Sequence, residues 1–344
     1  MKSGCYTAMV TPFDGAVVDE PGLARLADFQ ILNGISGILA VGTTGESPTL
    51  DWEEHHRVVQ IYCQQARGRC LCIAGVGSNN TQEALSATRH AVDAGVDAVL
   101  LVDPYYNGPS SMEIRKEYLS PVAAAFPDVT LIPYVIPGRT GAQLLPEDLA
   151  LLHRAHPNVT AVKEATGNID NMRNTRRCCG PQFTILSGDD GLTLEMMTDP
   201  EIGAAGVISV VSNIAPKAVS DLVRLLAEQQ MDAAKRLAEG LAPLFGLVTV
   251  TTKEATPFGE VVCRARNPLA LKTLMQLLGM PSGPCRPPLG KMSRAGLERV
   301  VAIAKTVQTD HPGIFTPLGQ FFDIDIDARL NDKRLLDSLC YPTY

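Results

Sequence analysis

Short apolar runs rich in β-branched residues recur along the first two thirds of the chain, and stretches with helical periodicity separate most of them. One helical stretch begins at Asp51, which can form a capping box with Glu54. Another covers residues 81–94 and ends at Gly95, a typical helix stop. The apolar runs that predict strands are residues 6–10, 37–41, 71–74, 98–102, 131–135, 160–162, 183–186 and 205–210.

Strands that alternate with helices favour parallel pairing through right-handed crossovers. Eight such units within about 215 residues predict an α/β fold, a (β/α)8 barrel, rather than an open sheet. An open doubly wound sheet is the alternative, but no GxGxxG follows an early strand, which argues against its dinucleotide-binding form.

Beyond Pro216 we expect no further strands, because apolar residues recur at helical spacing through residues 219–226. Asn267 as a cap and Pro268 in the first turn predict another helix, which Gly279 closes. Residues 297–307 predict one more helix.

The last stretch has a different character. Residues 310–344 are interrupted by prolines, and residues 321–327 alternate apolar and acidic side chains. This pattern predicts a strand-like or extended arm that packs on a neighbouring subunit. The expected organisation is a barrel over residues 1–216, a C-terminal helical domain over residues 217–309 and a C-terminal extension over residues 310–344.

Composition narrows the class of protein. Of 344 residues, 45% are hydrophobic, which is enough for a large core, and the formal net charge is −7. The acidic balance and the lack of a basic run argue against nucleic-acid binding. Nine cysteines, an odd number without a CxxC pair, indicate reduced thiols in the cytoplasm. We expect no signal peptide, and the longest nearly apolar run, residues 241–250, is too short to span a membrane.

The sharpest chemical signal is Lys163, which ends the sixth predicted strand in register with apolar residues. In a barrel, such a position points into the interior or its mouth, where active sites lie. Burial lowers the pKa of an amine, and a neutral amine can attack a ketone to form a Schiff base. The alternative is an ion pair with Glu164 or another acid.

Two other strand ends carry candidate ligand-binding groups. Thr43 and Thr44, with backbone amides between glycines, could cradle a carboxylate after strand two. A simple glycine turn with a threonine helix cap is the alternative. After strand five, Tyr134 could relay protons and Arg139 could hold a carboxylate, unless they are only a partly buried tyrosine and a solvated arginine.

Nothing in the chain predicts a metal or a cofactor. His153 and His156 lie on a predicted surface helix without a third ligand at useful spacing. Small residues after strand seven, such as Gly188, leave room for a ligand against the backbone.

Together these motifs resemble the dihydrodipicolinate synthase and N-acetylneuraminate lyase family of pyruvate-linked Schiff-base aldolases. The resemblance runs from about residue 4 to 305. The matching segments are Gly42-Thr43-Thr44-Gly45-Glu46, Pro104-Tyr105-Tyr106-Asn107, Tyr134 with Pro137-Gly138-Arg139-Thr140-Gly141, Val162-Lys163-Glu164-Ala165-Thr166-Gly167-Asn168, Ser187-Gly188-Asp189-Asp190 and Gly206-Val207-Ile208-Ser209, with Asn267-Pro268 and Lys272 as a further match.

The resemblance implies a role for each site residue. Lys163 would condense with the keto carbon of pyruvate, and Tyr134 would shuttle protons. Tyr134 would be linked through Thr43 to Tyr106, which in the family comes from a neighbouring subunit. A homo-oligomer, a dimer or a tetramer, is therefore implied. The residues implied to bind substrate are Thr44 for the pyruvate carboxylate, Gly188 and Ile208 through their backbones, and Arg139 for the second substrate.

The second substrate is an aldehyde that the enamine attacks. The turn that contains Arg139 resembles that of the synthase branch of the family. In that branch the arginine binds the carboxylate of aspartate semialdehyde, and the product is 4-hydroxy-tetrahydrodipicolinate on the lysine pathway. A related aldolase or dehydratase that acts on sugar acids or hydroxy-keto acids is the alternative, and a non-catalytic binding protein is a third. Val135 departs from the asparagine usual in the family and removes a polar side chain near the catalytic tyrosine.

Members of the synthase branch are often inhibited by lysine at a subunit interface. The residues that resemble this effector site are Trp52, His55, Asn79, Glu83 and Tyr105. Glu83 could receive an ammonium group and His55 could form a hydrogen bond. An ordinary helix-surface cluster is the alternative.

Overall fold

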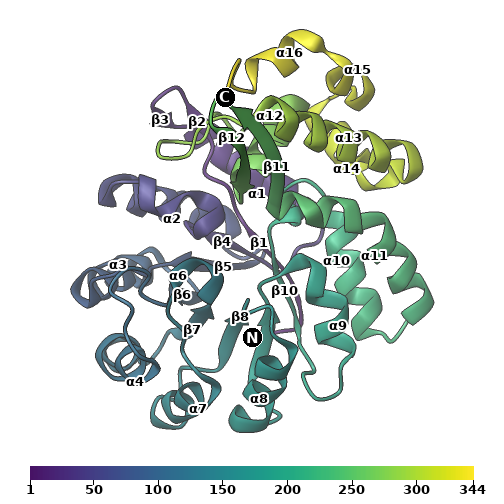
Figure 1. The fold of residues 1–344 in the computed structure, drawn as a ribbon. Coiled ribbons are helices and arrows are strands. Elements are labelled where there is room, and N and C mark those ends of the chain that lie inside the picture. Colours follow the sequence, from purple (N-terminus) through teal and green to yellow (C-terminus); the bar gives the residue numbers. More distant parts are fainter.

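Eight parallel strands close into a barrel in which β1 is hydrogen-bonded to both β4 and β10 (Figure 1). The computed structural model describes residues 1–344. The barrel strands are β1 (Gly4–Ala8), β4 (Gly37–Ala40), β5 (Leu71–Gly75), β6 (Ala98–Val102), β7 (Thr130–Val135), β8 (Ala161–Glu164), β9 (Thr184–Ser187) and β10 (Gly206–Ser209). The prediction of a (β/α)8 barrel is confirmed.

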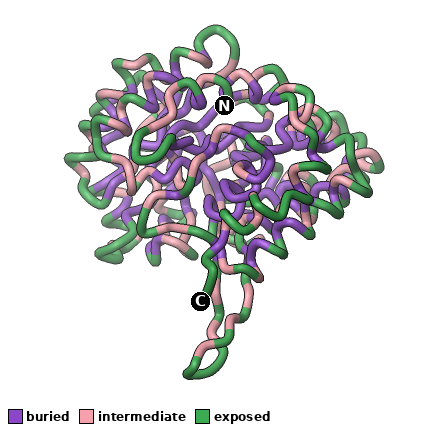
Figure 2. Tube along the Cα trace, turned by 90° about the horizontal axis from the view of Figure 1, so that it is seen from above, coloured by how far each residue is buried: buried purple, intermediate pink, exposed green.

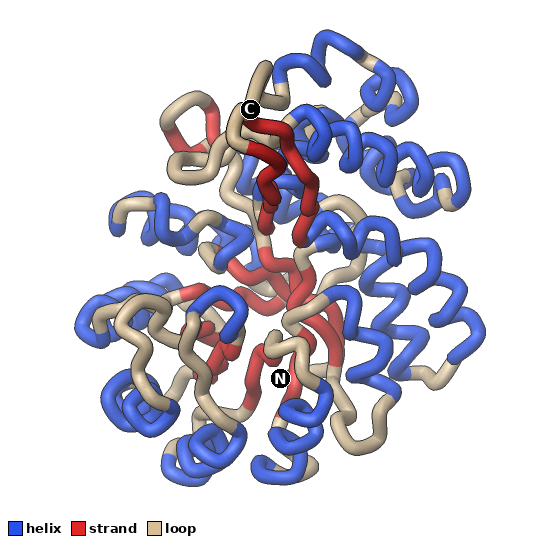
Figure 3. The backbone as a smooth tube through the Cα atoms, viewed as in Figure 1, coloured by secondary structure: helices blue, strands red, loops and turns tan.

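Helices surround the strands (Figure 3). The two predicted helix signals are confirmed: the Asp51 carboxylate accepts a bond from the Glu54 amide at 2.8 Å, and Gly95 ends its helix with φ 86°. The helices of the barrel are α1 (Glu20–Leu32), α2 (Trp52–Ala66), α3 (Thr81–Ala94), α4 (Ser111–Glu113), α5 (Ser120–Ala125), α6 (Pro137–Thr140), α7 (Pro146–Ala155), α8 (Ile169–Cys179), α9 (Thr193–Thr198) and α10 (Pro216–Ala227). A small hairpin, β2 (Phe13–Asp14) and β3 (Val17–Val18), follows β1.

Three longer helices form most of the C-terminal part: α11 (Met231–Phe245), α12 (Leu269–Leu278) and α13 (Arg294–Asp310). The predicted helices after residue 216, around 269–278 and over 297–307, are confirmed. The prediction that the Asn267 side chain caps α12 is wrong. That side chain donates instead to the Thr44 hydroxyl in the barrel, at 3.0 Å.

The expectation that strands stop after Pro216 is also wrong. Strands β11 (Thr249–Thr256) and β12 (Gly259–Arg266) pair as an antiparallel hairpin that projects from the body of the molecule (Figure 2). Val250 and Ala265 are buried at its base, whereas Phe258 at its tip is 99% exposed. The less exposed positions of β11 after Val250 carry Thr252, Glu254 and Thr256, so that strand lacks the alternation of large apolar residues that would predict it.

The C-terminal tail is helical and packs on its own chain, which corrects the prediction of an extended arm. It forms α14 (Thr316–Phe322), α15 (Ile326–Asn331) and α16 (Lys333–Ser338). The rings of Phe321 and Phe322 lie 5.3 and 5.1 Å from that of Phe29 in α1.

The acidic residues that suggested strand alternation in the tail are helix-terminal residues instead. Asp323 ends α14 with φ 57°, and the Asp325 carboxylate accepts a bond from the first turn of α15. In the last turn of α12, Arg329 donates to the carbonyl of Leu277 and also to the carbonyl of Gln276, which accepts the Gly279 amide as well. The tail therefore satisfies polar groups of its own chain.

One apolar cluster of 84 buried residues extends from Cys5 to Cys340 and thus through all three predicted parts of the chain. The division at residues 216 and 309 remains our proposal for how the chain is organised. None of the helices is both long enough and apolar enough to cross a bilayer.

Candidate active site

Lys163 and Tyr134 are direct neighbours across the pair of strands β7 and β8. The Lys163 ammonium nitrogen lies 4.2 Å from the centre of the Tyr134 ring, and both side chains are at most 5% exposed. Side chains alternate along a strand, so Glu164 faces the opposite side, where its carboxylate accepts bonds from the Thr166 amide and the Asn171 side chain. The alternative of an ion pair between Lys163 and Glu164 is therefore wrong.

Burial changes the chemistry of this amine. Desolvation lowers the pKa of Lys163 from 10.5 to about 7, Asp190 opposes the shift and Arg139 adds to it. A substantial fraction of the amine is then neutral at neutral pH and can act as a nucleophile. Gly188 leaves the space for it, since a Cβ at this glycine would lie 3.2 Å from the Cε of Lys163.

Asp190 is a buried carboxyl group at the end of the Ser187-Gly188-Asp189-Asp190 segment, and the sequence alone assigns it no role in the site. Its carboxylate accepts bonds from the amides of Val210 and Val211 at 2.9 and 3.1 Å, just after β10. Burial raises the pKa of Asp190, and bonds from Ser209 and these amides oppose that rise. Asp190 thus connects the loop after β9 to the next strand and tunes the amine of Lys163.

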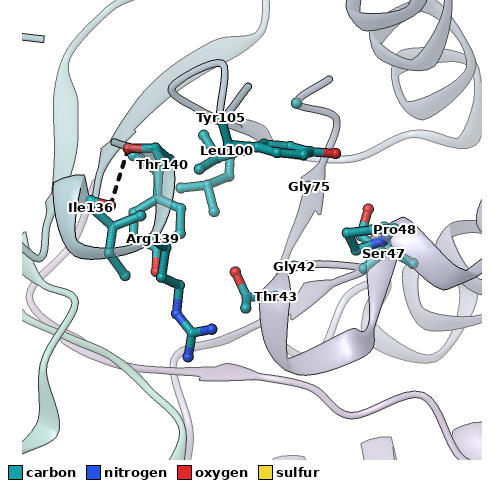
Figure 4. A pocket seen from close by; sticks show the side chains of 14 residues that line it. Gly42, Thr43, Ser47, Pro48, Gly75, Leu100, Tyr105, Ile136, Arg139 and Thr140 are labelled. Carbon is teal, nitrogen blue, oxygen red and sulfur yellow. Dashed lines mark hydrogen bonds between the residues drawn. The ribbon is translucent and has the colours of Figure 1, made fainter. Parts of the chain in front are cut away.

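A cavity of about 190 Å³ opens beside this pair at the carboxyl ends of the strands. Figure 4 shows Thr43 and Arg139 at the cavity, with the ring of Tyr105 across its upper edge. Tyr134 also lines it, and burial raises the pKa of Tyr134 to about 12, an effect that Arg139 and the Thr43 side chain partly offset. The phenol is therefore protonated at neutral pH and can donate a hydrogen bond or a proton.

Arg139 is carried by the short helix α6, which follows β7 directly. Its guanidinium donates to the carbonyl of Asn267 at 3.3 Å and forms no ion pair with an acidic side chain. Burial lowers the pKa of Arg139, while Tyr134 raises it and Arg266 lowers it further. An arginine with no anionic partner at the mouth of a cavity is suited to bind a carboxylate.

Asn267 is the site residue that sequence reasoning missed. Asn267 is 6% exposed, and its side-chain nitrogen donates to the Thr44 hydroxyl. Its backbone carbonyl accepts a bond from Arg139, and its side-chain oxygen has no partner. The sequence signal was ambiguous, because an asparagine before a proline at a helix start is usually read as a cap. Asn267 therefore ties the C-terminal part of the chain to both proposed carboxylate-binding residues.

Tyr106 is the predicted catalytic residue that the structure does not bring to the site. It is 85% exposed and does not line the cavity, whereas its neighbour Tyr105 does. Ile208, in contrast, is fully buried in the inner layer of the barrel together with Tyr134. The single chain thus assembles all the proposed catalytic residues except Tyr106.

The concern about Val135 is resolved by strand geometry. Tyr134 belongs to the inner cluster of the barrel and Val135 to the outer one, because consecutive side chains point to opposite faces. The expectation that this valine removes a polar neighbour of the tyrosine side chain is therefore wrong. Val135 is 2% exposed and packs as an ordinary apolar residue.

The residues of the predicted effector site form two contact groups. The Asn79 side chain accepts from the Tyr105 amide at 2.6 Å, and Glu83 is near enough to raise the pKa of Tyr105 together with burial, the larger cause. In the other group, the Trp52 and His55 rings lie 5.1 Å apart.

His55 is 4% exposed and donates to the carbonyl of Gly75 at 3.0 Å. Burial lowers the pKa of His55 to about 4, so the ring is neutral. Its Nδ1 atom is a buried acceptor without a partner. No group of three or more His, Cys, Asp or Glu side chains is close enough to hold a metal ion.

A closed α/β barrel with a desolvated lysine beside a tyrosine, and an unpaired arginine at the mouth, defines a Schiff-base-forming lyase of the class I aldolase type. The chain belongs to the Dihydrodipicolinate synthetase family, whose sequence model matches residues 1–307. The match ends before α14, close to residue 305, where the resemblance of the sequence motifs to the family also ends.

Individual relatives agree with this assignment. The chain is 41% identical over 305 residues to 4-hydroxy-tetrahydrodipicolinate synthase of Trichlorobacter lovleyi, covering 89% of this chain and 98% of that one. The solved structure of the synthase from Methylacidiphilum fumariolicum superposes with a TM-score of 0.83 at 35% identity, covering 91% and 98% of the two chains. The structure of the enzyme from Cyanidioschyzon merolae with lysine bound gives a TM-score of 0.80 at 33% identity, covering 89% and 98%.

The lowered pKa of Lys163 predicts a pH profile. Formation of the pyruvate adduct is expected to accelerate as pH rises towards about 7 and to level off above it, because only the unprotonated amine attacks. Arg139→Gln should move the midpoint upwards, since Arg139 lowers this pKa, and Asp190→Asn should move it downwards. Borohydride trapping at a series of pH values measures the profile, and a flat rate across neutral pH would contradict the assignment.

Proposed function

We propose that this protein condenses pyruvate with L-aspartate 4-semialdehyde to 4-hydroxy-tetrahydrodipicolinate, in lysine and diaminopimelate biosynthesis. The observation that carries the proposal is the buried Lys163 amine beside Tyr134, whose side chain lines the same cavity as the unpaired Arg139. The relatives named as this synthase share about 40% of their sequence with nearly the whole chain.

The proposed first half of the reaction uses Lys163 as the nucleophile. Its neutral Nζ attacks the keto carbon of pyruvate, and the carbinolamine that forms loses water to give an imine. Loss of a proton from the pyruvate methyl group then gives an enamine. Tyr134 is proposed to move protons in these steps, supported by its contact with Lys163, and Gly188 and Ile208 are proposed to bind pyruvate through their backbones. The Thr44 hydroxyl, oriented by Asn267, is proposed to bind the carboxylate.

The second half joins the enamine carbon to the aldehyde carbon of the second substrate, and the aldehyde oxygen takes up a proton to become a hydroxyl group. The amino group of that substrate then attacks the imine carbon, which closes the ring and releases the Lys163 amine. Arg139 is proposed to hold the carboxylate of this aldehyde, because its guanidinium is partly buried and has no acidic partner. A sugar tail offers hydroxyls rather than a carboxylate and would need neutral donors instead. This difference in charge favours the semialdehyde over sugar acids.

We propose that Tyr106 completes the proton relay from a second copy of the chain, so that a dimer or tetramer is the active form. The support is that Tyr106 directly follows Tyr105, which lines the cavity, and that its side chain is 85% exposed and free to contact another subunit. We also keep the cytoplasm as the proposed compartment, supported by nine free cysteines.

The function is tested by assaying the semialdehyde and sugar acids with the same enzyme. Arg139→Ala is expected to lower kcat/KM for the semialdehyde by about 100-fold, through loss of charge-assisted bonds to its carboxylate. Pyruvate should still be trapped on Lys163 when the pH lies above the midpoint of adduct formation. Activity on sugar acids alone, unchanged by Arg139→Ala, would favour the alternative aldolase.

We propose that lysine binds at the cluster of Trp52, His55, Asn79, Glu83 and Tyr105. The free Nδ1 acceptor of His55 and the carboxylate of Glu83 are suited to ammonium groups. Added lysine is expected to lower the rate of the native enzyme, and Glu83→Gln should weaken this inhibition about tenfold. Initial rates over a lysine titration measure it, and a flat response up to saturating lysine would show that the cluster is not an effector site.

A further inference from the structure

The end of the β11–β12 hairpin is joined to the turn that carries Arg139 by a reciprocal pair of bonds. The Arg266 guanidinium donates to the carbonyl of Gly138 at 3.2 Å. In return, the Arg139 guanidinium donates to the carbonyl of Asn267 at 3.3 Å. The last residue of β12 is therefore fixed beside the mouth of the cavity, although it lies 128 residues from that turn in the sequence.

This arrangement brings two arginines together without an acidic side chain to neutralise them. Neither Arg139 nor Arg266 takes part in an ion pair, whereas many other arginines of the protein do. The two charges act on each other, since Arg266 contributes to lowering the pKa of Arg139 after the larger effect of burial. Such repulsion is relieved when an anion binds between or beside the two groups.

The bond to Gly138 does not by itself explain an arginine at this position. Arg266 is exposed, and its side chain makes a single hydrogen bond, from Nη1 to the neutral carbonyl of Gly138. A guanidinium has five N–H donors, so the others are available to a ligand at the mouth.

We propose that Arg266 is a specificity-determining residue that, together with Arg139, recognises the carboxylate of the aldehyde substrate. This inference rests on the proposed function. It adds Arg266, from the β11–β12 hairpin, to Arg139 as a second cation in the binding site of the aldehyde substrate. Pyruvate condenses deeper in the barrel, at Lys163, so Arg266 acts on the second substrate only.

A matched pair of variants separates this role from a general effect of charge. Arg266→Gln removes the cation but keeps a side-chain N–H donor, and Arg264→Gln removes an equal charge two residues away. Arg264 lies on the same face of the same strand, is exposed and has no bond to the barrel. Both variants are assayed with varied semialdehyde at saturating pyruvate, and thermal unfolding checks that they fold.

Arg266→Gln is expected to raise KM for the semialdehyde about fivefold with kcat nearly unchanged, as for loss of one solvent-exposed charge contact. KM for pyruvate should stay the same, and Arg266→Lys should restore most of the loss. The difference between Arg266→Gln and the native enzyme should shrink at high salt, because salt screens exposed charges. Arg264→Gln should match the native enzyme.

The outcomes distinguish the two proposals. If Arg266→Gln behaves like Arg264→Gln while the native enzyme consumes the semialdehyde, the role of Arg266 is overturned and the function stands. If Arg266→Lys is as impaired as Arg266→Gln and salt changes nothing, Arg266 only holds the turn and the inference is likewise overturned. If the native enzyme does not consume the semialdehyde at all, the proposed function fails first.

Discussion

Replacement of Lys163 by alanine is expected to lower kcat by about 10⁴-fold or more, the scale seen when a covalent nucleophile is removed. No other lysine can take its place, because Lys272, the other fully buried lysine, is paired with Glu46. The remaining groups of the cavity can bind substrates but cannot form the imine. Steady-state assays with pyruvate and the semialdehyde measure the loss.

Two variants control this experiment. Lys163→Arg keeps a cation at the site but offers a guanidinium that is protonated at any working pH, so it should be equally inactive. Lys116→Ala removes a lysine that is exposed and should leave the rate unchanged. Residual activity within about tenfold of the native rate in Lys163→Ala would rule out the Schiff-base mechanism at this residue.

Replacement of Lys272 by methionine is expected to cost about 3–5 kcal/mol of folding stability, because it leaves the Glu46 carboxylate buried without its counter-charge. The two side chains are at most 1% exposed and their charged atoms are 2.6 Å apart. The Lys272 ammonium also donates to the carbonyls of Thr11 and Pro284, at 2.9 and 3.4 Å. Because Lys272 lies in α12 and Glu46 follows the turn that contains Thr43 and Thr44, this ion pair holds α12 against that turn. Denaturant unfolding measures the change.

The matched control is Lys217→Met, which breaks an exposed ion pair with Asp221 and should cost at most about 1 kcal/mol. The double variant Lys272→Met with Glu46→Gln should lose less than Lys272→Met alone, because no unpaired charge remains. Equal stability losses for Lys272→Met and Lys217→Met would show that the buried pair contributes little.

The barrel could be predicted because its signals are local and repeated. Each strand is a short apolar run, and capping residues such as Asp51 and Gly95 mark the helices between them. Lys163 stood out for the same reason, as a charged residue in register with apolar neighbours at a strand end. The alternation of side chains along β7 also explains why Val135 removes no polar group beside the Tyr134 side chain. The structure shows that Val135 packs in the outer cluster of the barrel.

The remaining parts depend on contacts between distant residues. Asn267 looks like a helix cap in the sequence, and only folding brings it within 3.0 Å of the Thr44 hydroxyl, 223 residues away. The tail shows a strand-like alternation, but its phenylalanines pack against Phe29 in α1 and its acids end or cap short helices. The hairpin lacks a buried face along most of its length, so it leaves no clear periodicity.

The central claim is that Lys163 forms the covalent link to pyruvate, and mass spectrometry after borohydride reduction tests it most directly. The native enzyme, incubated with pyruvate and reduced, should carry one added mass equal to a reduced pyruvate imine, located on the peptide that contains Lys163. Adding the semialdehyde before reduction should decrease this adduct, since the enamine is consumed. An adduct that persists in Lys163→Ala, or no adduct in the native enzyme, would contradict the account.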